Sequence, residues 1–216
     1  MEHPKLLSVG VILLGLMILV PVETVNAIDE GAFIEAACNG QSEIVKLFLD
    51  KNVNINAKAS NGVTALMCAS FNNHPEMVEL LLKKGANANA VDETGETALI
   101  KASCKGHPGV VKMLLDNGID VNTAQKDGIT SLMCASFNNH TDVAELLVKN
   151  GADVNVVDGT GETALIKASC KGHLDTVTML LRNQANSDAR TRDGVSALQC
   201  ASAYGNLEVV KSLMGP

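Results

Sequence analysis

Residues 61–74 read NGVTALMCASFNNH, and residues 127–140 read DGITSLMCASFNNH. Residues 94–107 and 160–173 both read TGETALIKASCKGH, and residues 193–206 read DGVSALQCASAYGN. The start of the segment advances by about 33 residues each time, and a fixed period of that size is the signature of a repeat architecture. We therefore expect the fold to be decided by stacked repeats and not by one globular core.

The period divides the chain into six units of two alternating types. A weaker copy comes first, and the last copy is shortened. The predicted units are 28–60, 61–93, 94–126, 127–159, 160–192 and 193–216. Nearly identical sequence recurs only in every second unit, which indicates duplication of a two-repeat block.

Each unit is predicted to contain two short helices. In the second unit, Thr64 is placed to accept backbone N–H bonds at the start of the first helix. Gly106 or, in other units, Asn73 ends that helix, since both residue types tolerate a positive φ. The second helix carries apolar residues from Met77 to Leu82 and stops before Gly85. Neither helix is long enough to be stable alone, so stacking on neighbours must stabilise it.

The pattern T-A-L-x-x-A-S-x-x-x-H, followed by V-x-x-L-L-x-x-G-A-x-x-N, resembles the ankyrin repeat from Ile28 to near the end of the chain. The resemblance implies an all-α solenoid of stacked helix-turn-helix units with short β-hairpin-like loops. The chain departs from the usual Thr-Pro-Leu-His of this family, because Ala65 and Met67 stand where Pro and His are usual. Loss of that His removes a side-chain hydrogen bond that often ties repeats together in the family.

The first 27 residues differ from the repeats and are predicted to be a signal peptide. Lys5 precedes an apolar run from Leu6 to Val20, and residues 25–27 read VNA. Such a run is short for a membrane span, and the small residues fit cleavage after Ala27, so that the mature chain begins at Ile28. The alternative is a retained membrane anchor. We expect a periplasmic or secreted protein with no membrane span after removal of the signal.

Every unit carries one cysteine, in one of two slots that lie three residues apart on the first helix and therefore on one face. Pairing the outer slot of one repeat with the inner slot of the next uses all six. The predicted disulfides are Cys38–Cys68, Cys104–Cys134 and Cys170–Cys200. An oxidising compartment favours these bonds. The alternative is small buried thiols, and a metal site is disfavoured because no two cysteines are close in sequence.

Composition excludes several function classes. Apolar residues make up 46% of the chain but aromatic residues only 2%, and the formal net charge is -7. An acidic chain lacks the basic footprint that nucleic acids require. The Ser, His and Cys residues recur in every repeat, as scaffold residues do, and no phosphate loop or zinc-protease motif is present. We expect a monomer that is not an enzyme and needs no cofactor or metal.

Members of the ankyrin-repeat family bind proteins through loop tips and the concave face of the first helices. The matching loop-tip positions are Asn61, Glu93, Thr94, Glu96, Lys126, Ile129, Glu162 and Arg192. The matching helical positions are Phe71, Asn72, Lys101, Lys105, Phe137, Asn138, Lys167, Lys171 and Tyr204. The two repeat types predict rows of Phe between rows of Lys, with exposed rings as interface anchors. The alternative is that Phe71 and Phe137 only cover the adjacent first helix.

The resulting hypothesis is a binding module that docks on another protein, either an exported enzyme or an envelope protein, as an inhibitor or a protective factor. The rival hypothesis is a thiol-based redox or metal-buffering protein that uses the repeated Cys and His residues.

Overall fold

The computed structural model describes residues 9–13, 16–20 and 22–215. Two antiparallel strands come first, followed by helices to the end of the described chain. The elements are β1 (Val9–Leu13), β2 (Leu16–Val20), α1 (Val22–Cys38), α2 (Ser42–Asp50), α3 (Ala65–Phe71), α4 (Pro75–Lys83), α5 (Ala98–Lys105), α6 (Pro108–Asp116), α7 (Ser131–Phe137), α8 (Thr141–Lys149), α9 (Ala164–Lys171), α10 (Leu174–Arg182), α11 (Ala197–Ala203) and α12 (Leu207–Met214).

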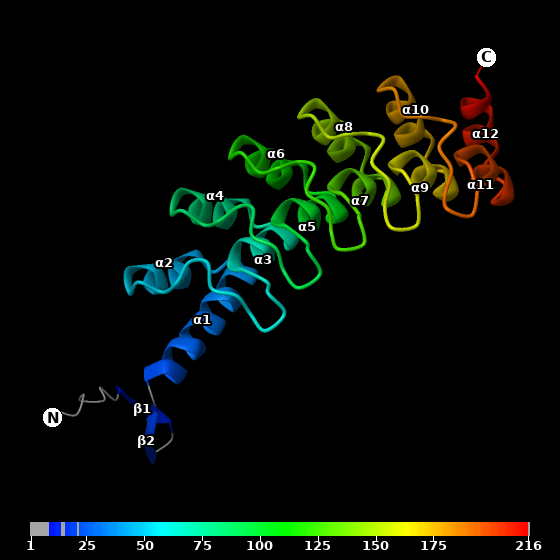
Figure 1. Ribbon diagram of the computed structural model, residues 1–216. Coiled ribbons are helices and arrows are strands. Elements are labelled where there is room, and N and C mark those ends of the chain that lie inside the picture. The colour runs from blue at the N-terminus through cyan, green and yellow to red at the C-terminus, as the bar shows by residue number, and fades with distance from the viewer. Residues whose placement is uncertain (1–8, 14–15, 21, 216) are drawn as a thin grey trace.

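The helices form antiparallel pairs that stack in sequence order (Figure 1). The odd-numbered first helices make one row, the even-numbered second helices make the other, and the loops project beside the first row. First helices contact their neighbours more extensively than second helices do, so the stack curves toward the first helices. Isolated bridges such as Lys58 to Thr64 give the loops their hairpin form. The predicted all-α repeat solenoid is confirmed.

The core is a layered series of small and medium side chains. The alanine of the A-S pair on each first helix after α1 is fully buried, as at Ala69 and Ala102, and the leucine three residues earlier is nearly so, as at Leu66 and Leu99, except in the last repeat, where Leu198 is 36% exposed. Close approach of neighbouring helices requires such small residues, because interiors pack at crystal-like density. Phe33 is the one fully buried aromatic among the described residues. A chain with few aromatics can therefore build its core by repetition.

Local signals in the sequence set the ends of the first helices. The Thr64 hydroxyl accepts a hydrogen bond from the Met67 N–H at 3.3 Å, and the same cap recurs in the later repeats. Gly106 takes a φ of 70° at the end of α5, while Asn73 takes 56° in the other repeat type. Both predictions are confirmed.

Polar side chains tie neighbouring repeats together. The Asn56 side-chain oxygen accepts a hydrogen bond from the Asn87 N–H at 2.8 Å, and the same bond recurs in the following three repeats. The His107 ring nitrogen lies 3.0 Å from the Phe71 carbonyl oxygen of the preceding repeat, and His74 makes the equivalent contact. These bonds offset the loss of the usual family histidine.

Residues 1–8, 14–15 and 21 of the predicted signal peptide lie outside the described residues. Helix α1 passes through Ala27 and Ile28, so the structure is that of the uncut chain and cleavage stays a prediction. No helix in the described ranges combines the length and the apolar character needed to cross a membrane.

Candidate protein-binding surface

The six cysteines lie in three pairs at disulfide-bonding distance, in the arrangement that the sequence predicts. The Cα atoms of Cys38 and Cys68 are 4.8 Å apart, and the other two pairs, Cys104–Cys134 and Cys170–Cys200, are equally close. Each pair joins the end of one first helix to the middle of the next, across the first–second, third–fourth and fifth–sixth repeat junctions. No group of three or more His, Cys, Asp and Glu side chains in the described chain is placed to hold a metal ion.

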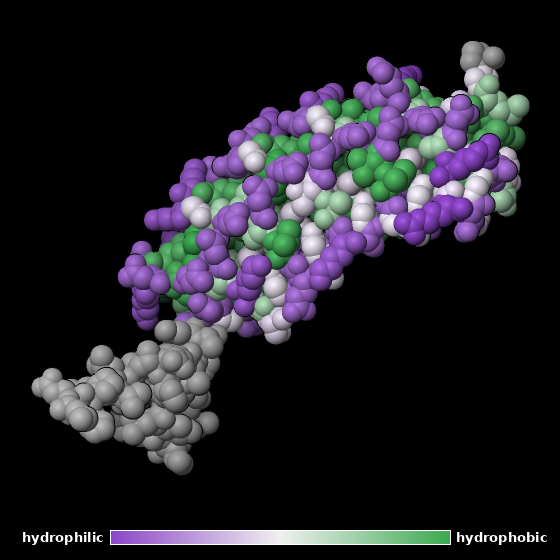
Figure 2. Space-filling view, viewed as in Figure 1, coloured by the Kyte–Doolittle hydropathy of each residue, from purple (hydrophilic) through white to green (hydrophobic). Residues whose placement is uncertain are grey.

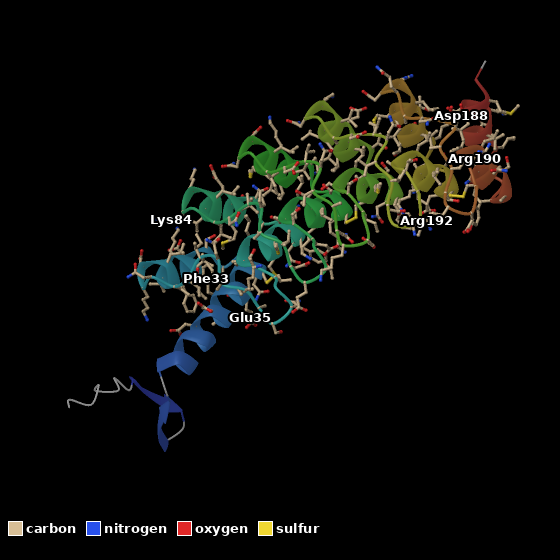
Figure 3. All side chains as sticks on the ribbon, viewed as in Figure 1. Phe33, Glu35, Lys84, Asp188, Arg190 and Arg192 are labelled. Atoms are coloured by element: carbon tan, nitrogen blue, oxygen red, sulfur yellow. A yellow bond between two sulfur atoms is a disulfide. The ribbon has the colours of Figure 1, made fainter. Side chains whose placement is uncertain are left out.

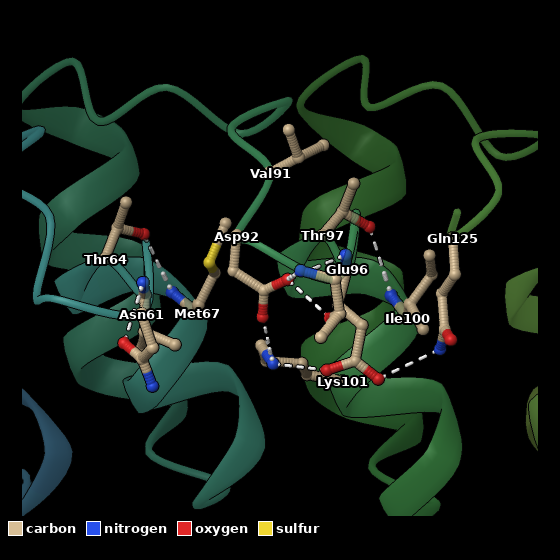
Figure 4. A network of polar contacts seen from close by, with 12 residues as sticks. Asn61, Thr64, Met67, Val91, Asp92, Glu96, Thr97, Ile100, Lys101 and Gln125 are labelled. Atoms are coloured by element: carbon tan, nitrogen blue, oxygen red, sulfur yellow. Dashed lines mark hydrogen bonds and ion pairs between the residues drawn. The ribbon is translucent and has the colours of Figure 1, made fainter. Parts of the chain in front are cut away.

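A cluster of ion pairs fixes the loop of the third repeat (Figure 4). The Lys101 ammonium lies 2.7 Å from an Asp92 oxygen and also contacts Glu96. The other Asp92 oxygen accepts hydrogen bonds from the Thr94 hydroxyl and from the N–H groups of Thr94 and Glu96. The Gln125 amide, from the end of the same repeat, donates to Glu96 at 2.9 Å. One lysine therefore organises a complete loop tip.

Burial and ion pairing shift the pKa values of Asp92 and Lys101 in opposite directions. Burial alone would raise the pKa of Asp92, but hydrogen bonds from Lys101 and Thr94 and from backbone N–H groups lower it to about 2. Burial would lower the pKa of Lys101, and the two carboxylates reverse this and raise it. Both groups are therefore charged near neutral pH, and the cluster persists as an ion pair.

The same cluster recurs at Asp158, Glu162 and Lys167 in the fifth repeat, where the pKa of Asp158 is also lowered to about 2, burial again opposing its hydrogen bonds. This corrects the prediction for both lysines. The Lys101 and Lys167 side chains are only 12% and 11% exposed and already hold two carboxylates each. Instead of forming exposed rows for a partner, they stabilise the loops beside the surface.

The remaining predicted lysines lie against the predicted aromatic rings. Lys105 lies over the Phe71 ring, 4.5 Å from its centre, and Lys171 lies over Phe137 at the same distance. The rings are still 41% and 44% exposed. Each ring thus makes a cation–π contact with the next repeat while its residue remains partly exposed. Separate rows of Phe and Lys do not form, because Lys105 and Lys171 each lie over a Phe ring.

Other predicted residues lie on the same face. Tyr204 is 71% exposed, the highest value among the aromatic side chains described. The exposed amides of Asn72 and Asn138 donate to the carbonyl oxygens of Cys38 and Cys134, so they also brace the helices. Glu93 is exposed at a loop tip, and its N–H donates to the carbonyl of Asn61 in the preceding loop. Glu96 and Glu162 are half-buried and serve mainly the lysine clusters.

In Figure 2 polar residues dominate the visible face, and apolar residues form separate patches between them. Such a surface offers several small anchors and no single large apolar area.

Models of a family described as ankyrin repeats (3 copies) match residues 16–92, 33–125, 85–158 and 132–216. The chain belongs to the ankyrin-repeat family. No curated protein matches it. Ankyrin repeats are in general protein-protein interaction modules. The three cysteine pairs at bonding distance are characteristic of proteins in oxidising compartments.

The roles of Asp92 and Asp158 were not predicted from the sequence. A signal was present, because each Asp precedes a Lys by nine residues in both units of one type, and the other type lacks both residues.

Proposed function

We propose that this ankyrin-repeat protein is an exported, disulfide-braced binding module that docks a partner protein on its first helices and loop tips. The observation that carries the proposal is the line of Phe71, Phe137 and Tyr204 at the ends of three first helices, where these residues are 41%, 44% and 71% exposed. Aromatic anchors flanked by charge are typical of interface hot spots. The partner is an exported enzyme or an envelope protein, which the module inhibits or protects by covering its surface.

The three cysteine pairs support export, since disulfides persist in the periplasm or outside the cell. In this proposal the signal peptide is removed after Ala27. Mass measurement of the exported protein without reductant tests both points. The expected result is a chain that begins at Ile28 and carries no free thiol, and six free thiols would reject the bridged form.

Partner capture tests the docking face. The full chain, oxidised and immobilised, is compared with the variant Phe71→Ala plus Phe137→Ala. Loss of the captured partner with an unchanged unfolding midpoint supports the proposal. The matched control is Leu174→Ala, because Leu174 is similarly exposed, at 37%, but lies on a second helix. If both variants retain the partner equally, the aromatic line is not the docking face.

A redox or metal-buffering role is the rival. It requires the thiols to cycle with activity, so a partner that binds equally to the oxidised protein and to protein that has been reduced and then alkylated speaks against it.

A further inference from the structure

A groove of about 420 Å³ lies between the fifth and sixth repeats, on the face formed by the first helices and loops. This volume falls in the range of sites that bind small groups. Figure 3 shows Arg190 and Arg192 at the C-terminal end of the stack, near the groove. The groove is lined by Thr160, Glu162, Ile166, Thr191, Asp193, Val195, Gln199, Cys200, Ala203 and Tyr204.

The third–fourth repeat junction provides an internal comparison for this groove. Its first wall is identical in sequence, since residues 94–107 and 160–173 are the same. The second wall differs. Gln125 precedes the fourth repeat where Thr191 precedes the sixth, and the fourth repeat carries Phe137 where the sixth carries Ala203. Gln125 and Phe137 are thus replaced by smaller side chains, whereas Asn138 is replaced by the larger Tyr204.

The hydrogen bonds of the two equivalent glutamates differ accordingly. One Glu96 oxygen contacts Lys101 and the other accepts the Gln125 amide at 2.9 Å. Glu162 keeps the lysine contact, at 2.6 Å, but no side chain in the described part of the chain donates to its second oxygen. The Thr191 hydroxyl is engaged locally, where it accepts from the Val195 N–H at 3.1 Å. The groove therefore contains an acceptor that lacks its donor.

We propose that this groove is a subsite for a partner segment that carries a side-chain amide next to a large apolar side chain. The amide donates to Glu162, as Gln125 does to Glu96. The apolar side chain packs on Ile166, Val195 and Tyr204, beside the position where Phe137 is replaced by Ala203. The proposal rests on the proposed docking function and specifies the chemistry of one part of the partner.

The surrounding charges favour a neutral donor over a cationic one. Arg190 donates to the Gln199 side-chain oxygen at 3.2 Å and to the Gly194 carbonyl at 3.0 Å, and Arg192 is exposed nearby. A lysine or arginine from a partner would gain from Glu162 and Asp193 but would meet these two guanidinium groups. An amide makes the same hydrogen bond without that repulsion.

A peptide titration tests the subsite without knowledge of the partner. The 15N-labelled, oxidised full chain is titrated with N-acetylated, C-amidated Gly-Phe-Gln-Gly, and the control peptides are Gly-Phe-Glu-Gly, Gly-Ala-Gln-Gly and Gly-Phe-Arg-Gly. The expected result is chemical-shift change at Val195, Gln199 and Tyr204, with binding at least about fivefold weaker for each control. The Glu peptide loses the hydrogen bond, the Ala peptide loses the apolar contact, and the Arg peptide meets the guanidinium groups of Arg190 and Arg192. Absence of binding, tighter binding of the Arg peptide, or shifts confined to other repeats would overturn the proposal.

Two reciprocal variants give the matched controls. Thr191→Gln plus Ala203→Phe introduces the two large side chains of the equivalent junction into the groove. This variant is expected to abolish the chemical-shift changes caused by the Gln peptide. Gln125→Thr, Phe137→Ala and Asn138→Tyr together give the equivalent junction the corresponding side chains of the groove and are expected to create a second binding site, so that two peptides bind. The subsite proposal is refuted if the first variant binds the Gln peptide as wild type does and the second variant gains no further site.

Partner capture separates this proposal from the docking function. A partner held equally by wild type and by the Thr191→Gln plus Ala203→Phe variant refutes the subsite and leaves the docking function intact. A wild-type chain that binds the Gln peptide but captures no partner refutes the docking function instead.

Discussion

Replacing Lys101 with Met removes the cation from the loop cluster of the third repeat. The Asp92 side chain is only 5% exposed, so its carboxylate would remain buried without its strongest partner. Breaking a fully buried ion pair costs about 3–5 kcal/mol. The three hydrogen bonds from Thr94 and Glu96 remain and reduce this cost. The change in the pKa of Asp92 from 3.8 to about 2 corresponds to about 2 kcal/mol. We therefore expect Lys101→Met to lower the free energy of unfolding by about 2–3 kcal/mol.

Lys105→Met is the matched control, because it removes a lysine from the same helix that makes only an exposed cation–π contact. Its expected cost is about 0.5–1 kcal/mol. Urea unfolding of the oxidised proteins, followed by far-UV circular dichroism, gives both values from the midpoint and slope. Lys167→Met provides an internal replicate, since its cluster is equivalent. The reasoning is refuted if Lys101→Met costs no more than Lys105→Met, or if the two cluster variants differ by more than about 1 kcal/mol.

Further predictions concern pH, covalent bridging and a helix end. The pKa of Asp92 in the folded protein lies below its ordinary value, so the contribution of its carboxylate to the free energy of unfolding is complete above pH 3.8 and is lost as the pH falls toward about 2. The difference in free energy of unfolding between wild type and Asp92→Asn, measured by urea titration, should therefore narrow between these pH values. Replacing Cys104 and Cys134 together with Ser should cost about 3–4 kcal/mol, and reductant should remove most of the difference from wild type. Gly106→Ala should lower the thermal unfolding midpoint more than Gly118→Ala does. Both glycines have a positive φ, but of the two only Gly106 lies where an added Cβ would overlap a histidine ring of the next repeat, that of His140. Equal costs for the two glycine variants would contradict this.

Repetition made the fold predictable. Each signal occurs several times, so Thr64 as a helix cap and Gly106 as a helix end could be checked against their own copies. The cysteine pairing followed in the same way, because two slots on one helix face and an even count leave few arrangements. The position of the docking face came from the family resemblance.

The environment of individual side chains on that face was less predictable. Lys101 was expected to be exposed because its position matches exposed positions of the family. Its actual environment depends on Asp92, which belongs to the preceding loop and approaches only when the loop turns back over the helix. The exposure of Phe71 likewise depends on Lys105 in the next repeat. Hydropathy along one repeat contains no information on such contacts between repeats.

The alternation of bridged and unbridged junctions has a mechanical consequence. Each bridge closes a stretch of chain with a sequence separation of 30 residues, which corresponds to about 100 Å of contour length when extended. If the molecule is pulled from its two ends, only the second–third and fourth–fifth junctions, together with the chain outside the closed stretches, can yield to force. The oxidised molecule therefore reaches its maximum extension at a shorter length, and reduction of the three disulfides would add about 300 Å of contour length.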